Sequence, residues 1–185
     1  MKRLLKWLGI AAIAFVVVGA VIAAGAAGLR YSSSEQFCTS CHEMNAFAYA
    51  EFKGTVHDRN ASGVRAACSD CHVPREAVPM MIRKVEALRE VYGHLTGIID
   101  TKEKYEAHRY EMAKREWTRL KATDSATCRH CHNEAAMDPE LQSEKARTRH
   151  AKAKAEGLTC IDCHAGIAHT EPEGPGPREL KVGMK

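Results

Sequence analysis

The sequence predicts a mainly α-helical protein with one N-terminal transmembrane helix and a single extramembrane domain of helices and loops. Three observations predict this class. Residues 7–29 contain no charged side chain, and the rest of the chain, about 155 residues, has the size of one domain. That remainder shows two stretches of helical periodicity and no long β-branched strand pattern. Aromatic residues make up only 6% of the chain, so the polypeptide alone offers a thin apolar core.

The first element is a membrane anchor. A basic start precedes 23 uncharged residues, Trp7 to Leu29. As a helix this stretch is about 34 Å long, enough to cross the hydrocarbon core of a bilayer. The small residues at 24–28 would also suit cleavage of a signal peptide, but the apolar core of a signal peptide is usually about 7–15 residues long. We therefore expect an uncleaved anchor within residues 1–30.

The net charge of the chain is concentrated on this anchor. The chain has 27 basic and 23 acidic residues, a net charge of +4. Residues 1–30 supply that whole excess through Lys2, Arg3, Lys6 and Arg30. Because three of these charges precede the apolar stretch, the positive-inside rule places the N-terminus in the cytoplasm and the domain outside it. The neutral remainder gives no indication of a nucleic-acid partner.

Every cysteine belongs to one of four Cys-x-x-Cys-His motifs. They are Cys38-Cys41-His42, Cys68-Cys71-His72, Cys128-Cys131-His132 and Cys160-Cys163-His164. This motif is the attachment signature of c-type haem, in which the thiols bind the porphyrin and the histidine binds the iron. Two zinc sites or a set of disulfides would use the cysteines but not the histidines. The sequence therefore predicts four covalent haem c groups, which would form most of the core of a haem-packed cytochrome c domain.

The haem domain, residues 31–170, contains an internal duplication. Its haem pairs occupy residues 38–72 and 128–164, with motif starts 30 and 32 residues apart. In each half a lone histidine, His57 or His150, precedes a Cys-x-Asp-Cys-His motif by ten or eleven residues. We interpret this as a repeat of haem pairs, with chance similarity of short windows as the alternative. The Pro- and Gly-rich tail, 171–185, is expected to be extended and mobile.

A helical linker, residues 75–121, joins the halves. Its first helix is predicted from an apolar stripe at helical spacing, formed by Met81, Val85, Leu88, Tyr92 and Leu95. Pro79 lies near its start, and two glycines weaken its end. The second helix, 102–121, is rich in Glu, Lys, Arg and Ala, with Trp117 on its apolar side.

Additional histidines could complete the iron coordination. A low-spin haem with two histidine ligands needs a second imidazole beyond the motif histidine. We assign His57 and His150 to this role because they occupy matching places in the repeat. His169 lies only five residues after His164, so we expect it to reach a neighbouring haem. His94, with His108 as the weaker alternative, is the candidate for the remaining haem, and His130 is expected to face solvent.

The chain resembles the NapC/NirT family of membrane-bound tetrahaem quinol dehydrogenases, which includes the NrfH type. The similarity lies in the basic start, the single anchor and the paired motifs. It extends to the strings Cys-His-Glu-Met-Asn-Ala at 41–46, Asp-Cys-His-Val-Pro at 70–74 and Thr-Cys-Ile-Asp-Cys-His at 159–164. Some NapC members carry a histidine directly after Cys-His-Val-Pro, where this chain has Arg75. One distal ligand is therefore left unassigned.

The resemblance implies a single-pass protein of the bacterial inner membrane with a periplasmic haem domain. Such a protein oxidises menaquinol or ubiquinol and passes electrons to a periplasmic reductase, most simply a nitrate reductase, with nitrite or other terminal reductases as alternatives. It is then an electron-transfer subunit and not itself the enzyme that reduces nitrate or nitrite. An electron shuttle without a quinol site is the alternative function. Self-association of the chain is left open.

The resemblance also suggests a quinol site beside the first haem. Met44 follows His42 by two residues, and in NrfH-type relatives this methionine can replace the motif histidine on the iron. Normal ligation by His42, with Met44 in a packing role, is the alternative. Lys84 matches the position of a quinol-site lysine, and Glu90 and Asp100 are the candidate proton acceptors. A solvated helix face would explain Lys84 and Glu90 equally well.

Overall fold

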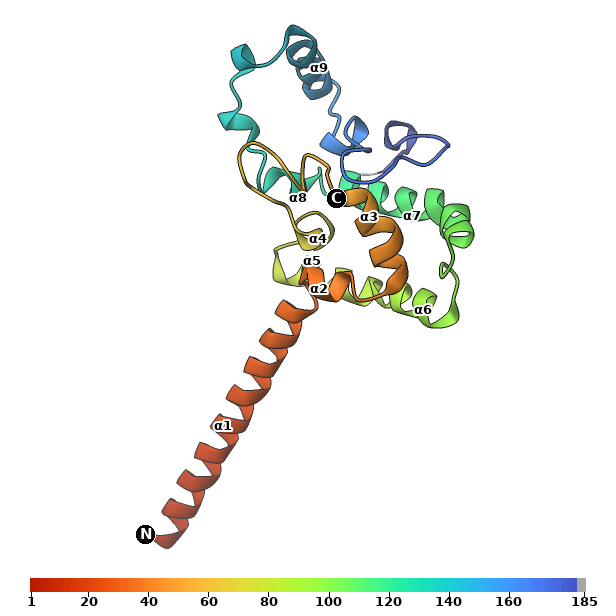
Figure 1. Ribbon diagram of the computed structural model, residues 1–185. Coiled ribbons are helices and arrows are strands. Elements are labelled where there is room, and N and C mark those ends of the chain that lie inside the picture. The colour runs from red at the N-terminus through yellow and green to blue at the C-terminus, as the bar shows by residue number, and fades with distance from the viewer. Residues whose placement is uncertain (183–185) are drawn as a thin grey trace.

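The structure is a computed structural model and describes residues 1–182. A long N-terminal helix projects from a domain of shorter helices and loops (Figure 1), and residues 1–182 contain no β-strand. The predicted mainly α fold is confirmed.

The projecting helix, α1 (Lys2–Tyr31), is the predicted anchor. None of its residues is buried, and within residues 1–182 it is the one helix long and apolar enough to cross a membrane. Its last turn is closed by serines, since the Ser33 hydroxyl donates to the Leu29 carbonyl at 2.8 Å. Arg30 in that turn is favourably placed against the negative end of the helix dipole. The anchor therefore ends in a polar turn directly before the domain.

The first half of the domain is built from short helical segments. These are α2 (Glu35–Cys38), the π-helical η1 (Met44–Tyr49), α3 (Ala50–Phe52) and α4 (Cys68–His72). Glu35 holds them together, because its carboxylate accepts hydrogen bonds from the Tyr49 hydroxyl at 2.9 Å and from Arg65 at 2.7 Å. The long-range contacts bring α2 and α4 side by side.

The linker forms three helices. The predicted first helix is split into α5 (Ala77–Glu86) and α6 (Leu88–Thr96), which meet at Ala87. The predicted helix at 102–121 is observed as α7 (Lys102–Ala122). Its start is fixed by Thr101, whose hydroxyl accepts the Lys104 backbone N–H at 3.3 Å. The helical periodicity was therefore interpreted correctly, but the break at Ala87 was not predicted.

The second half consists of one longer helix among short turns. Its elements are α8 (Ala126–Arg129), η2 (Glu134–Ala136), η3 (Pro139–Leu141), α9 (Glu144–Ala155), η4 (Cys160–Asp162) and η5 (Pro177–Glu179). Among residues 1–182 only four large apolar side chains are buried: Phe52, Tyr105, Trp117 and Ile161. A core this small fits a domain whose interior is completed by bound cofactors.

The described part of the tail packs against α7. The Tyr110 hydroxyl donates to the Pro175 carbonyl at 3.2 Å, and Arg178 pairs with Glu156 at 2.9 Å. Pro177 is buried. These contacts attach the described part of the tail to α7 and to Glu156, while the mobility of the tail stays a prediction; residues 183–185 lie outside the described part of the chain.

Candidate functional site

The four motifs lie on four different elements that meet in the domain. The first joins α2 to η1, and the others lie on α4, α8 and η4. None of the eight cysteines is paired in a disulfide. Among residues 1–182 no group of three or more His, Cys, Asp or Glu side chains is arranged to hold a metal ion by itself. The geometry therefore gives no support to the zinc or disulfide alternatives.

Cysteines of successive motifs are neighbours. A hydrogen bond from the Cys68 thiol lowers the pKa of Cys38 to about 6, and one from Cys128 does the same for Cys160. Helices α4 and α8 also pack together. Burial raises the pKa of Cys71, and the Cys131 thiol is near enough to add to this effect. The motifs therefore follow one another in space in the order of the sequence.

The aspartate shared by the second and fourth motifs has a local structural role. Asp70 accepts the backbone N–H of Ala67, and Asp162 accepts that of Thr159, each at 2.8 Å. Both residues therefore cap the turn that presents the first cysteine of the motif. This common device gives a physical reason for the Cys-x-Asp-Cys-His repeat.

Three motif histidines each face a second histidine. The ring centroids are 6.1 Å apart for His57 and His132, 6.1 Å for His72 and His169, and 6.2 Å for His150 and His164. An imidazole nitrogen lies about 2 Å from the metal it binds, and the ring centre roughly 1.2 Å further, so opposed ligands of one metal have centroids about 6.3 Å apart. All three pairs have the separation that two axial ligands of one iron require.

The first motif is built differently. The ring beside His42 belongs to Phe47, at a centroid distance of 6.1 Å. Glu43 is 2% exposed, and its carboxylate lies between His42 Nδ1 at 3.1 Å and His94 Nδ1 at 2.6 Å. Both Nε2 atoms are thereby left available for a metal. Met44 is half-buried at the start of η1.

The candidate quinol residues lie at the membrane end of the domain but do not form one cluster. The Lys84 ammonium donates to the Ser32 carbonyl at 2.7 Å, the Ser32 hydroxyl at 2.9 Å and the Ser33 hydroxyl at 2.8 Å. Lys84 is thus fixed at the end of α1, and burial lowers its pKa. Its positive charge also contributes to the lowered pKa of Cys38, after the Cys68 hydrogen bond and against the effect of burial.

The two candidate proton acceptors have other partners. Glu90 is exposed and contacts Arg83 at 3.5 Å, not Lys84. Asp100 accepts from Lys104 at 2.7 Å. That hydrogen bond lowers the pKa of Asp100, and nearby His42 adds to the effect. Of these two candidates, Asp100 is therefore the one nearer the first motif.

The two remaining histidines stand apart from the imidazole pairs. His108 is exposed, with its Nδ1 2.8 Å from the Lys104 carbonyl. His130 Nε2 lies 4.0 Å from Glu76, and its side chain is 22% exposed. His130 is therefore more enclosed than its predicted solvent-facing position implied, because α8 packs against α4.

Two partly buried ionic clusters were not predicted from the sequence. Glu116 on α7 accepts from His72 Nδ1 at 3.3 Å and from Arg83 at 3.2 Å. Burial raises the pKa of Glu116, but the hydrogen bond to His72 and the adjacent positive charges lower it more, to well below its usual range. The α7 helical pattern reveals its polar face, but not which motif this face approaches.

The second cluster surrounds His169. Arg109 Nη1 donates to Glu51 at 2.9 Å and to the Thr170 carbonyl at 3.1 Å, while the Thr170 N–H donates to Glu51 at 3.0 Å. These contacts hold both backbone groups of Thr170, the residue that follows His169. Burial lowers the pKa of His169, which favours the neutral imidazole that can bind a metal.

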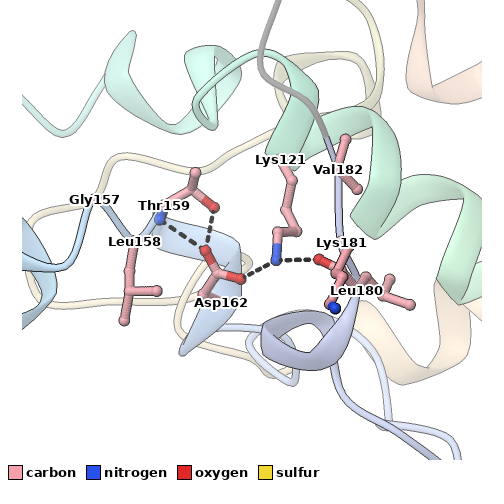
Figure 2. Close-up of a pocket in the computed structure, with 8 residues that line it drawn as sticks. All are labelled: Lys121, Gly157, Leu158, Thr159, Asp162, Leu180, Lys181 and Val182. Atoms are coloured by element: carbon pink, nitrogen blue, oxygen red, sulfur yellow. Dashed lines mark hydrogen bonds and ion pairs between the residues drawn. The ribbon is translucent and has the colours of Figure 1, made fainter.

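A third ionic contact ties the fourth motif to the tail. Figure 2 shows Lys121 reaching from α7 toward Asp162 and the tail backbone. Its ammonium lies 2.7 Å from Asp162 and donates to the Pro177 and Leu180 carbonyls at 2.7 and 2.8 Å. An open cavity of about 450 Å³ is lined by Lys121, Asp162 and Leu180 together with Gly157, Leu158, Thr159, Lys181 and Val182.

Lys121→Met is expected to lower the free energy of unfolding by about 3 kcal/mol, since it leaves the buried Asp162 carboxylate without its cation. Burial opposes the ionised form of Asp162, but the Lys121 and Thr159 contacts make the net pKa lower than usual. The contribution is therefore present above the unfolded pKa, about 3.9, and is lost as the pH falls below it. Denaturant unfolding at several pH values measures the effect.

The matched control is Lys154→Met, at an exposed position of α9, which should change the free energy of unfolding little. Equal effects of the two substitutions would contradict the assignment.

The anchor-like helix, the four attachment motifs and the opposed imidazoles define a class: a multihaem c-type cytochrome that transfers electrons. The chain belongs to the NapC/NirT cytochrome c family, whose N-terminal region it matches over residues 1–174. This family consists of membrane-anchored cytochromes, and its cofactor is haem c.

The relatives support this assignment over most of the chain. The cytochrome c-type protein NapC of Escherichia coli K12 is 47% identical over 192 residues, which cover 99% of this chain and 94% of that protein. The denitrification system component NirT of Stutzerimonas stutzeri is 51% identical over 146 residues, 79% of this chain and 73% of the relative. A putative tetraheme cytochrome c of Allochromatium vinosum is 44% identical over 172 residues, 92% and 93% of the two chains. No solved structure matches the chain.

Proposed function

We propose that the chain holds four covalent haem c groups through its four cysteine pairs. Three of these haems have an axial pair of histidines in this proposal: His132 with His57, His72 with His169, and His164 with His150. Centroid separations of 6.1–6.2 Å support these assignments. For the first haem the ligands are His42 or Met44 on one side and His94 as the candidate on the other. The haems supply one-electron acceptors and donors when bound.

The contacts between motifs support a linear path for electrons. Cys38 contacts Cys68, and Cys128 contacts Cys160, while α4 and α8 join the two pairs. Haems attached at neighbouring thiols lie close together. We infer that electrons pass through the motifs in chain order, from the membrane end to η4.

Glu116 tunes the second haem in this proposal. When a carboxylate accepts a hydrogen bond from the Nδ1–H of an axial histidine, the imidazole becomes a stronger electron donor to the iron. A stronger donor stabilises ferric iron and so lowers the midpoint potential. Glu116→Gln is therefore expected to raise the midpoint potential of the haem on Cys68 and Cys71 by tens of millivolts. Redox titration followed by visible spectroscopy measures this shift. Glu111→Gln, at an exposed position of the same helix, should leave all potentials in place, and a similar shift in both would exclude the specific role.

We further propose that the protein oxidises a quinol, menaquinol or ubiquinol, at the membrane surface. The observation that carries this proposal is the position of Lys84, held against Ser32 and Ser33 at the end of α1 and close to Cys38. Its three N–H donors are taken by Ser32 and Ser33, so a quinol oxygen would replace one serine hydroxyl as acceptor and be oriented at the boundary of the lipid, next to the first haem. Oxidation of a quinol releases two electrons and two protons, so a nearby base is also needed. Both candidate carboxylates are paired with a cation, Asp100 with Lys104 and Glu90 with Arg83, and Asp100 is the one whose pKa His42 also lowers, which favours it for this role.

The proposed electron acceptor is a soluble periplasmic reductase, with nitrate reductase as the first candidate. Relatives include NapC proteins and a denitrification system component, which supports a partner in nitrogen-oxide respiration. The proposed location is the bacterial inner membrane, crossed once by α1, with the basic N-terminus in the cytoplasm. Haem attachment takes place outside the bacterial cytoplasm, which agrees with this orientation.

The full-length haem-loaded protein is expected to be reduced by a menaquinol analogue in nanodiscs and to show no nitrate or nitrite reduction alone. Stopped-flow absorbance measures haem reduction, and product assays measure nitrite and ammonium. Reduction by a soluble donor but not by quinol would favour the alternative, an electron-shuttle cytochrome without a quinol site. Nitrate or nitrite turnover by the isolated protein would instead contradict the role of an electron-transfer subunit.

A further inference from the structure

Helices α5 and α6 turn their apolar sides away from the domain. Within residues 1–182 the large apolar side chains exposed on these two helices are Val78, Met81, Ile82, Val85, Leu88, Val91, Tyr92 and Leu95. Their exposed fractions run from 47% to 77%. An amphipathic helix of a soluble domain normally directs such a stripe into the core. Here no other part of residues 1–182 covers the stripe, and we call these eight residues the apolar face.

The side of α5 that packs on the domain is its polar side. At about 100° per residue, Arg83 lies about 150° from the centre of the stripe formed by Val78, Met81, Ile82 and Val85. The Arg83 side chain is 13% exposed and is bound to Glu116 of α7. Since Glu116 also contacts His72, the second attachment motif lies on this polar side. The apolar side of α5 therefore faces away from that haem.

Helix α6 repeats this arrangement. Gly93 is its buried residue, and at about 100° per residue it lies about 150° from the centre of the stripe formed by Leu88, Val91, Tyr92 and Leu95. His94, which contacts Glu43 of the first motif, is also off the stripe. Each helix thus contacts the haem domain through a polar side chain, Arg83 of α5 and His94 of α6, and both expose their apolar residues.

The apolar face lies at the membrane end of the domain. Figure 1 shows α5 and α6 along the edge of the domain from which α1 departs. Lys84 of α5 is bound to Ser32 and Ser33, directly after the anchor. The face is therefore continuous with the end of the membrane-spanning helix. Tyr92 on the face is also of a type enriched at membrane–water interfaces.

We propose that α5 and α6 lie in the lipid interface as a second membrane contact, with the apolar face inserted among the acyl chains. A helix with one apolar and one charged side adopts this position on a bilayer. The contact would fix the tilt of the haem domain together with the junction after α1, where Lys84 holds Ser32 and Ser33. The first attachment motif would then be held at the level of the lipid headgroups. This inference rests on the anchor and not on the proposed quinol chemistry.

The test uses the full-length haem-loaded protein in nanodiscs that contain a phospholipid with a diazirine in its acyl chain. After irradiation, mass spectrometry of peptides identifies the residues reached by the acyl chains. Labels are expected within 78–95 as well as within α1, and not at Val64 or Leu141, which are exposed apolar residues elsewhere. Labelling of α1 alone would overturn the proposal. Cross-links between two copies of 78–95 in place of lipid labels would overturn it in favour of self-association.

A substitution pair tests the face itself. Val85→Asp combined with Leu95→Asp is expected to reduce lipid labelling of 78–95 at least fivefold, with labelling of α1 as the internal standard. Leu141→Asp, at an 87% exposed site of η3, should not change the pattern. Unchanged labelling in the double variant would overturn the proposal. If that variant fails to retain its haems, the labelling pattern of the unaltered protein decides the question.

Discussion

Replacing His57 with alanine is expected to convert one haem of the protein from low-spin to high-spin. His57 faces His132 at a centroid distance of 6.1 Å, and no thioether depends on it. The substitution should therefore leave the haem on Cys128 and Cys131 attached but with one axial imidazole. EPR is expected to show the loss of one low-spin signal and the appearance of a high-spin ferric signal. Haem content measured by pyridine haemochrome should remain unchanged.

Two further substitutions make this expectation specific. His150→Ala should have the same effect on a different haem, the one on Cys160 and Cys163, because His150 faces His164 at 6.2 Å. His130→Ala serves as the matched control, since His130 contacts Glu76 and no motif imidazole. Unaltered EPR spectra of both the His57 and His150 variants would remove the axial assignments. A change of spin state in the His130 variant would show that the substitution disturbs the fold instead.

Lys84→Ala is expected to slow haem reduction by menaquinol about 10- to 100-fold. The hydrogen bond from the charged Lys84 to the quinol oxygen would contribute about 1.5–3 kcal/mol. If this bond is made in the transition state, each 1.36 kcal/mol changes the rate about tenfold. All four haems should remain attached and reducible by dithionite. Lys84→Arg keeps the charge and should retain much of the rate. The measurement is stopped-flow reduction in nanodiscs.

The control for this result is Lys114→Ala. It removes the same charge from an exposed position of α7 and should leave the quinol reaction unaffected. Normal quinol kinetics in the Lys84 variant would exclude it from the quinol site without affecting the family assignment. Equal slowing in both variants would indicate that the loss of a positive charge weakens the attraction of the domain to the membrane in general.

The sequence by itself determined the features that depend on local pattern. The uncharged run from Trp7 to Leu29 became α1, because only a helix satisfies the backbone of such an apolar segment within lipid. The polar, helix-forming segment at 102–121 became α7 within one residue of the prediction. The four motifs and the family followed from residues adjacent in the chain. In each case the relevant interaction spans only a few residues, so that composition and spacing were sufficient.

The tertiary structure decided which groups meet across the chain. The repeat placed His57 and His150 in matching positions, yet His57 faces a motif in the other half of the chain while His150 faces its own half. Spacing along the sequence does not define such long-range pairs, because they depend on the path of the linker between the halves. The same holds for Glu116 against His72.

The spacing of the apolar residues on α5 and α6 likewise did not determine whether their stripe faces the domain or points away from it. The spacing of Met81 and Val85 predicts a helix with one apolar side, but a core and a lipid surface satisfy that side equally well. Only the contacts of Arg83 with Glu116 and of His94 with Glu43 show that the stripe points outward. Periodicity records which residues share a side of a helix, whereas the packing of neighbouring elements decides what that side touches.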